Sequence, residues 1–100
     1  MPGEFLDVDP RLLRASYNRP HGADPFKLAR QMARYGSSIA TMPSVWVWRC
    51  KDGKLMIADG MTRATRAADL LPGQLIQVEV TEDHPELDVS YLPTIGDLLP

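Results

Sequence analysis

The segment from residue 55 to residue 80 places the strongest constraint on the fold, because its pattern changes between the signals of strands, turns and a helix. Residues 55–58 are a short apolar run, which an Asp-Gly pair ends. Apolar residues then recur with helical spacing over residues 62–71, and a Pro-Gly pair stops that helix just past its C-terminus. Residues 75–80 again alternate between apolar and polar side chains. The segment therefore predicts a strand, a tight turn, a helix, a loop and a strand.

The predicted helix has two different faces. Its narrow apolar face follows an i, i+3, i+4, i+7 pattern and is expected to be buried; it consists of Ala64, Ala67, Ala68 and Leu71. The remaining residues fall mostly on the polar side of the helix, and they are Thr62, Arg63, Thr65, Arg66 and Asp69.

The turn before this helix has the chemistry of an anion site. Gly60 lets a ligand approach the backbone closely, and the first N–H groups of a helix have no partner within it. These N–H groups and the positive end of the helix dipole attract an anion. Thr62 adds a hydroxyl, Arg63 adds a guanidinium that suits phosphate or carboxylate oxygens, and Arg66 follows one turn later. The spacing leaves an alternative open, in which Asp59 caps the helix and both arginines are solvated.

The turn also carries a family resemblance. The signature D-G-x-x-R-x-x-x-A of the ParB/sulfiredoxin-like superfamily resembles the run Asp59-Gly60-Met61-Thr62-Arg63, which is followed by alanines at 67 and 68. Most of the chain shares the resemblance. Residues 8–20 are similar to the first family box, residues 24–36 to a helix that ends in glycine, and residues 44–58 to the hairpin before the signature.

The resemblance implies a small α/β domain that binds a nucleotide, either ATP, as in sulfiredoxin and free-serine kinases, or CTP, as in chromosome-partitioning ParB, with Mg²⁺ carried by the nucleotide. By position, the implied phosphate contacts are Gly60, Met61, Thr62 and Arg63, and the first box adds Arg19. Two departures bear on the chemistry. Met61 stands where sulfiredoxin has its reactive cysteine, so reductase chemistry is not expected. Met61 and Thr62 also replace the glutamate and first arginine of the Gly-Glu-Arg-Arg motif of ParB, which weighs against CTP hydrolysis.

Length and composition favour one domain in a reducing compartment. A chain of 100 residues with 44% hydrophobic residues can bury a core without disulfides. Cys50 is the lone cysteine, which fits the cytoplasm. The first residues do not resemble a secretory signal, and no apolar run is long enough to span a membrane. The two histidines and Cys50 are too far apart in sequence to suggest a metal site.

Charge is distributed unevenly along the chain. The net charge is −2, but residues 1–66 carry +5 and residues 67–100 carry −7. This asymmetry fits an anionic ligand on the basic part. It is not the strongly basic balance of a dedicated nucleic-acid binder.

A second helix is predicted between residues 24 and 36. Asp24 followed by proline is typical of a helix start, and Gly36 of a helix end. The expected buried stripe is Phe26, Ala29, Met32 and Ala33, and the expected solvated basic face is Lys27, Arg30 and Arg34.

Two further strands precede the central segment. Residues 5–8 predict a first strand. Residues 44–49 alternate valines with tryptophans, which predicts a strand covered on both faces, and residues 51–54 have the Asp-Gly signal of a tight hairpin. Trp46 and Trp48 are expected in the core, with a stacking platform for a base as the alternative.

Taken together, these patterns predict an α+β domain over residues 1–81, with a mixed β-sheet and two main helices. Residues 82–100 are expected to form an acidic arm and an apolar tail that packs on the domain or on a protein partner. The leading functional hypothesis is a ParB-like domain that binds a nucleotide or another phosphate anion at residues 60–63. Two alternatives stay open. One is a nucleotide-dependent phosphotransferase or nuclease, for which Asp59 is the best-placed base; the other is a DNA-associated or protein-interaction module that binds nucleic acid weakly and without catalysis.

Overall fold

The computed structural model describes residues 2–36, 38–39 and 42–99 and has an α+β fold built on one mixed sheet. The strands follow the order β1-β4-β2-β3, where β2 is parallel to β4 and the two outer pairs are antiparallel. They are β1 (Glu4–Val8), β2 (Val45–Arg49), β3 (Leu55–Asp59) and β4 (Ile76–Asp83). The helices are α1 (Pro25–Tyr35), α2 (Met61–Leu70), α3 (Ile95–Leu98) and the short 3-10 helices η1 (Pro10–Leu12) and η2 (Lys51–Gly53). The mixed sheet and the two main helices confirm the predicted fold class.

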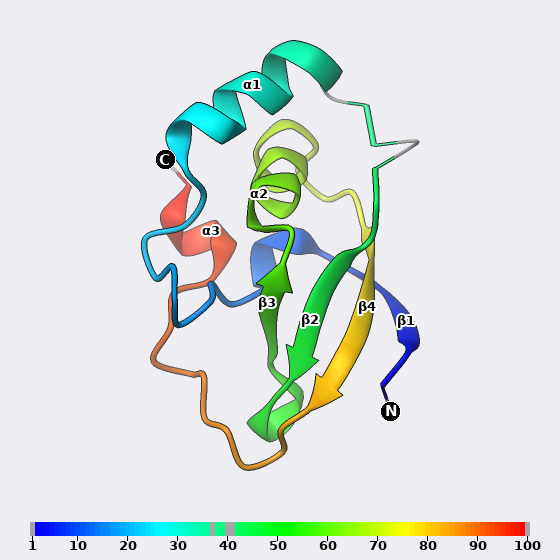
Figure 1. Cartoon of the computed structure of the whole chain (residues 1–100), viewed down its shortest axis with the longest axis vertical. Helices are drawn as coiled ribbons and strands as arrows, with labels where there is room; N and C mark the ends of the chain where they lie inside the picture. The colour runs from blue at the N-terminus through cyan, green and yellow to red at the C-terminus, as the bar shows by residue number, and fades with distance from the viewer. Residues whose placement is uncertain (1, 37, 40–41, 100) are drawn as a thin grey trace.

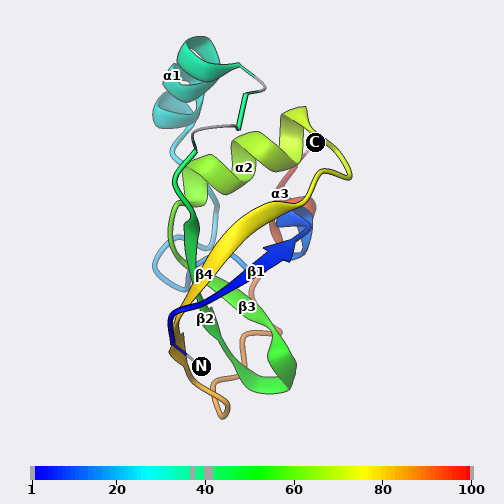
Figure 2. The same ribbon diagram turned by 90° about the vertical axis from the view of Figure 1, so that its right-hand side faces the viewer.

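The molecule is layered from the sheet outward. Helix α2 connects β3 to β4 and lies across one face of the sheet, and α1 lies on the far side of α2 (Figures 1 and 2). The core fills the space between the sheet and α2. It contains Val45, Val47, Ile57, Val78, Val80, Ala64, Ala67 and Ala68, each at most 1% exposed. The three alanines confirm most of the predicted apolar face of α2, and their small side chains let the helix lie close to the strands. The fourth predicted residue, Leu71, follows the helix as its C-cap and is half-buried.

Local signals set the ends of α1 as predicted. The Asp24 carboxylate accepts hydrogen bonds from the backbone N–H groups of Phe26 at 2.8 Å and Lys27 at 3.4 Å. Pro25 occupies the first turn, and Gly36 ends the helix with a φ of 57°. These are the interactions that fix where a helix begins and ends.

The predicted buried stripe of α1 is wrong. No residue of this helix is buried, and Phe26 is 81% exposed. Ala29 and Ala33 are also exposed, whereas the half-buried positions are Leu28, Gln31 and Met32. The physical reason is that α1 packs on α2 rather than on the sheet, so it has only a narrow contact face.

Part of the polar side of α2 is buried, so the alternative in which both arginines are solvated is wrong for Arg66. Thr62, Thr65 and Arg66 are 9%, 8% and 2% exposed, because α1 and the loop that follows it cover this side of the helix. Thr65 hydrogen-bonds to its own helix, donating to the carbonyl of Met61 at 2.8 Å.

The tryptophan strand is fully covered on its valine face and only partly covered on its tryptophan face. Trp46 is 48% exposed, so its placement in the core is wrong. Trp48 is partly buried, and its ring centroid lies 4.4 Å from that of His84 and 6.3 Å from that of Tyr17. Trp48 packs against a second cluster on this face of the sheet, made of Cys50, Met56, Val89 and Leu92.

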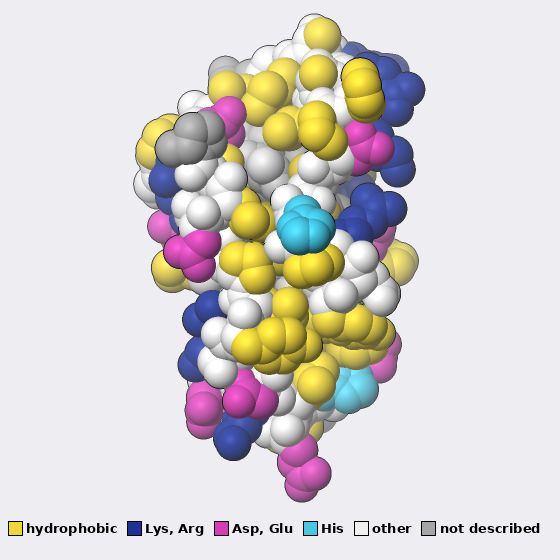
Figure 3. Space-filling view, turned by 90° about the vertical axis from the view of Figure 1, so that its left-hand side faces the viewer, with side chains coloured by type: hydrophobic (Ala, Val, Ile, Leu, Met, Phe, Trp, Pro, Cys, Tyr) yellow, Lys and Arg dark blue, Asp and Glu magenta, His cyan; other side chains and the backbone are white. Residues whose placement is uncertain are grey.

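The C-terminal residues belong to the same packed unit. Strand β4 runs on to Asp83, past the predicted strand end at residue 80. Ile95 in α3 is 1% exposed in the main core, and its N–H donates to the carbonyl of Leu13 at 2.8 Å. Hydrophobic side chains gather on the face over α3 and the C-terminal segment (Figure 3). Tyr91, a residue of the C-terminal segment, is 72% exposed.

Candidate functional site

The turn between β3 and α2 presents unpaired backbone donors. Gly60 has a φ of 100°, in the left-handed region that glycine tolerates, and no side chain caps the helix that follows. The first helical bond is from Ala64 N–H to the Gly60 carbonyl at 2.9 Å. The N–H groups of residues 61–63 therefore lie before the first intrahelical bond. Since Asp59 does not accept from them, the capping alternative is wrong.

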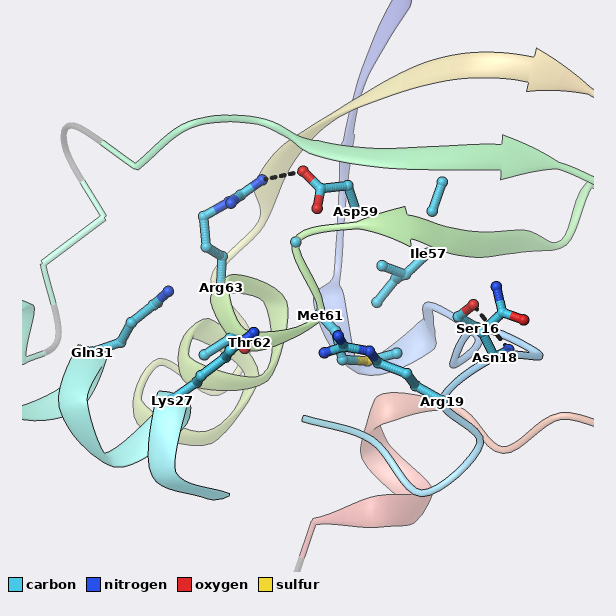
Figure 4. A pocket seen from close by; sticks show the side chains of 12 residues that line it. Ser16, Asn18, Arg19, Lys27, Gln31, Ile57, Asp59, Met61, Thr62 and Arg63 are labelled. Atoms are coloured by element: carbon cyan, nitrogen blue, oxygen red, sulfur yellow. Dashed lines mark hydrogen bonds and ion pairs between the residues drawn. The ribbon is translucent and has the colours of Figure 1, made fainter. Parts of the chain in front are cut away.

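The residues that carry these N–H groups line a pocket of about 320 Å³. Three segments supply its walls: the loop after η1, one face of α1, and the β3–α2 turn (Figure 4). The lining residues are Ser16, Asn18, Arg19, Lys27, Gln31, Ile57, Ala58, Asp59, Gly60, Met61, Thr62 and Arg63. The predicted residues Gly60, Met61, Thr62, Arg63 and Arg19, and the candidate base Asp59, are thus brought together. The volume of the pocket lies at the low end of the range of about 300–1,000 Å³ for small-molecule sites.

Two cationic side chains reach toward the start of α2 from opposite walls. Arg19 comes from the loop after η1 and Lys27 from α1 (Figure 4). Both residues are exposed, and within the described part of the chain neither side chain has an ion pair or hydrogen bond. Lys27 was missed from the sequence, where it was assigned to a solvated basic face. The helix cap at Asp24 fixes where α1 begins, but only the packing of α1 on α2 turns Lys27 into the pocket.

Arg63 is partly engaged within the protein. Its Nη2 donates to the Ser44 carbonyl at 3.2 Å and lies 3.5 Å from Oδ2 of Asp59, while its Nε is buried without a partner. Figure 4 shows the side chain directed toward Asp59 rather than toward Thr62. Arg63 folds over the turn closely enough that a Cβ at Gly60 would lie 2.9 Å from Nη2. It therefore links the turn to the residue before β2.

Arg66 does not line this pocket. It is 2% exposed, and its Nη1 donates to the carbonyls of Gly36 at 3.0 Å and Ser38 at 2.7 Å. Its guanidinium carbon lies 5.3 Å from the centre of the Tyr35 ring. The residue one helical turn beyond Arg63 thus points to a different part of the molecule, because α1 and α2 enclose it.

The pocket carries an excess of positive charge and one carboxylate. Asp59, with a side chain that is 63% exposed, is the acid among the lining residues. Among the residues that the structure describes, no three His, Cys, Asp or Glu side chains are grouped so as to hold a metal ion. Cys50 lies outside the pocket, and burial raises the pKa of its thiol. The arrangement is suited to binding an anion through fixed donors and two free cations.

No helix in the described ranges has the length and apolar character needed to cross a membrane. Comparison of the chain with protein-family models, with curated proteins and with solved structures finds no match.

Proposed function

We propose that the protein binds a nucleotide, or another phosphate-bearing anion, in the pocket at residues 60–63. The observation that supports this most strongly is that Arg19 and Lys27 approach an uncapped helix N-terminus from two separate segments. Helix N-terminal N–H groups and the helix dipole favour phosphate, and flanking cations add to the same attraction. The same ligand class follows from the resemblance to the ParB/sulfiredoxin-like superfamily.

The engagement of Arg63 is compatible with this role. Its carboxylate partner is mostly exposed, and exposed ion pairs contribute little free energy. A phosphate oxygen can therefore replace Asp59 as the partner of Arg63 at small cost. Asp59 would then be released at the mouth of the pocket, where one carboxylate together with phosphate oxygens is a usual set of ligands for a nucleotide-bound Mg²⁺.

Calorimetry with ATP and CTP in the presence of Mg²⁺ tests the proposal. Wild type should bind at least one of them. Arg19→Gln and Lys27→Gln should each weaken binding about tenfold, which is the effect of losing one charge-assisted hydrogen bond. Arg30→Gln is the matched control, because Arg30 lies on the same helix as Lys27 but does not line the pocket.

Two outcomes contradict the proposal. One is the absence of binding heat from wild type at nucleotide concentrations of about 1 mM. The other is an equal loss of affinity in Arg30→Gln and Lys27→Gln, which would indicate diffuse attraction to a basic surface. Measuring how much of the ATP or CTP in the same samples is converted to product over time distinguishes binding alone from catalysis.

A further inference from the structure

A second pocket, of about 300 Å³, lies on the other side of Arg63. Its described walls come from α1, α2 and the residues Ser38, Met42 and Pro43, and of these lining residues it shares Gln31 and Arg63 with the first pocket. Its described lining residues are Gln31, Tyr35, Ser38, Met42, Pro43, Arg63 and Arg66. The wall thus combines apolar surface with two guanidinium groups and no carboxylate.

Arg66 is a buried cation without a counter-ion in this wall. It is 2% exposed, and its hydrogen-bond partners in the described part of the chain are two neutral carbonyls, both bonded to Nη1. The Tyr35 ring beside its guanidinium group carries no net charge. The Nε of Arg66 is buried with no hydrogen-bond partner. The residues of the adjoining loop that lie outside the described ranges, Ser37, Ala40 and Thr41, have no acidic side chains. A buried charge is costly unless it is paired. An anion at this position would therefore reduce the free-energy cost of burying the Arg66 guanidinium.

A second buried donor lies in the same wall. Among the described residues the Nε of Arg63 has no hydrogen-bond partner, and Arg63 lines this pocket together with Arg66. The Oε1 of Gln31 is also unpartnered, but it is an acceptor, so an oxyanion does not satisfy it. Native structures leave few buried polar atoms unsatisfied, so two unpartnered Nε–H donors beside one cavity favour a ligand that carries acceptor oxygens. Tyr35 and Met42 provide an apolar wall beside these atoms.

We propose that this pocket binds a small organic anion, whose carboxylate or phosphate group pairs with Arg66 and whose apolar part lies against Tyr35 and Met42. The inference does not depend on nucleotide binding at residues 60–63, because Arg66 does not line that pocket. The shared chemistry is an oxyanion on a small apolar group. A planar guanidinium recognises such an oxyanion through parallel hydrogen bonds.

The test uses three probes that share a ring: benzoate, phenyl phosphate and neutral benzyl alcohol. Proton–nitrogen correlation spectra of the wild-type protein report each arginine Nε–H directly. Benzoate or phenyl phosphate should shift the Nε–H signal of Arg66, and benzyl alcohol should not. Arg66 is the reporter because Arg63 lines both pockets. The relative affinities of the two anions distinguish a carboxylate ligand from a phosphate ligand. An unchanged Arg66 signal with both anions at about 10 mM, where even fragment-sized ligands bind measurably, overturns the proposal, whether or not the Arg63 signal moves.

Variants separate this site from its surroundings. Arg66→Gln should lose at least about tenfold in affinity for the anionic probe while keeping nucleotide affinity at the first pocket. Arg34→Gln is the matched control, because the guanidinium carbon of Arg34 also lies 5.3 Å from the centre of the Tyr35 ring but Arg34 does not line this pocket. Equal weakening in Arg34→Gln and Arg66→Gln contradicts the assignment. If Arg66→Gln does not fold, the wild-type signals still decide the question.

Discussion

Replacing Gly60 with alanine tests the geometry of the turn. The residue has a φ of 100°, and an added Cβ would lie 2.9 Å from Nη2 of Arg63, 3.2 Å from its Cζ, and 3.2 Å from Cγ2 of Val45. The substitution therefore strains the backbone and displaces the arginine at once. It changes no charge and adds a single methyl group, so the effect can be attributed to this contact.

The expected cost is the sum of a backbone contribution and a packing contribution. A non-glycine residue in the left-handed region costs about 1–2 kcal/mol in the free energy of unfolding. Moving Arg63 breaks its hydrogen bond to the Ser44 carbonyl, which costs about 1 kcal/mol, whereas the exposed ion pair with Asp59 contributes little. Pressure on the buried Val45 adds about 1 kcal/mol. The total is about 3–4 kcal/mol, a large share of the stability of a small domain.

Urea-induced unfolding followed by tryptophan fluorescence measures this loss. Gly73→Ala is the control, because Gly73 has a φ of 83° but an added Cβ would meet nothing within 4 Å. That variant should show the backbone contribution alone, about 1–2 kcal/mol. The reasoning is refuted if the two variants lose equal stability, since Arg63 would then not occupy the space next to Gly60.

Two further predictions concern the rest of the fold. Ile95→Ala should lower the free energy of unfolding by about 2–4 kcal/mol by leaving a cavity in the core. Tyr91→Ala, at a position 72% exposed, is the control and should change it by less than about 0.5 kcal/mol. Equal effects of the two substitutions in urea unfolding would mean that α3 does not pack as described. Hydrogen bonds from Arg49 lower the pKa of Glu4 and Asp83 in the folded state, so their stabilising contribution is present at neutral pH and is lost as the pH falls through the lowered values. The stability difference between wild type and Arg49→Gln should therefore shrink below about pH 4, and a difference independent of pH would contradict it.

Signals that act within a few residues predicted the elements well. The Asp24 cap, the Gly36 stop and the Asp-Gly hairpin depend on hydrogen bonds and backbone angles that neighbouring residues determine, and each is present. The turn at Gly60 and the alanine face of α2 were likewise predictable from residues that are close in the sequence. The mixed sheet followed from the order of these elements.

What could not be predicted is which surface each helix meets. The spacing of apolar residues in α1 predicted Phe26 and Ala29 on its buried side. Because α1 packs on α2, Lys27 and Gln31 instead line the first pocket and Phe26 is exposed. Arg66 lies on a side of α2 that is solvated in an isolated helix and is enclosed here by α1. Periodicity gives the faces of an element, and only tertiary packing decides which of them is covered.

The same limit applies to the candidate site. Sequence placed the anion-binding donors at residues 60–63 and added Arg19 by resemblance, and the structure brings these together in one pocket. Arg66 was predicted to contact the same ligand, but this residue lines a separate cavity. Lys27 was omitted, because no local pattern marks a lysine whose role depends on where a neighbouring helix lies.

The central claim is that the amides at the start of α2 hold an oxyanion. Backbone proton–nitrogen spectra recorded during titration with MgATP, MgCTP and inorganic triphosphate observe these amides directly. The account predicts that the signals of Met61, Thr62 and Arg63 shift most, because phosphate oxygens accept from their N–H groups. Signals at these residues that stay unchanged, while those around Arg30 and Arg34 move, would contradict it.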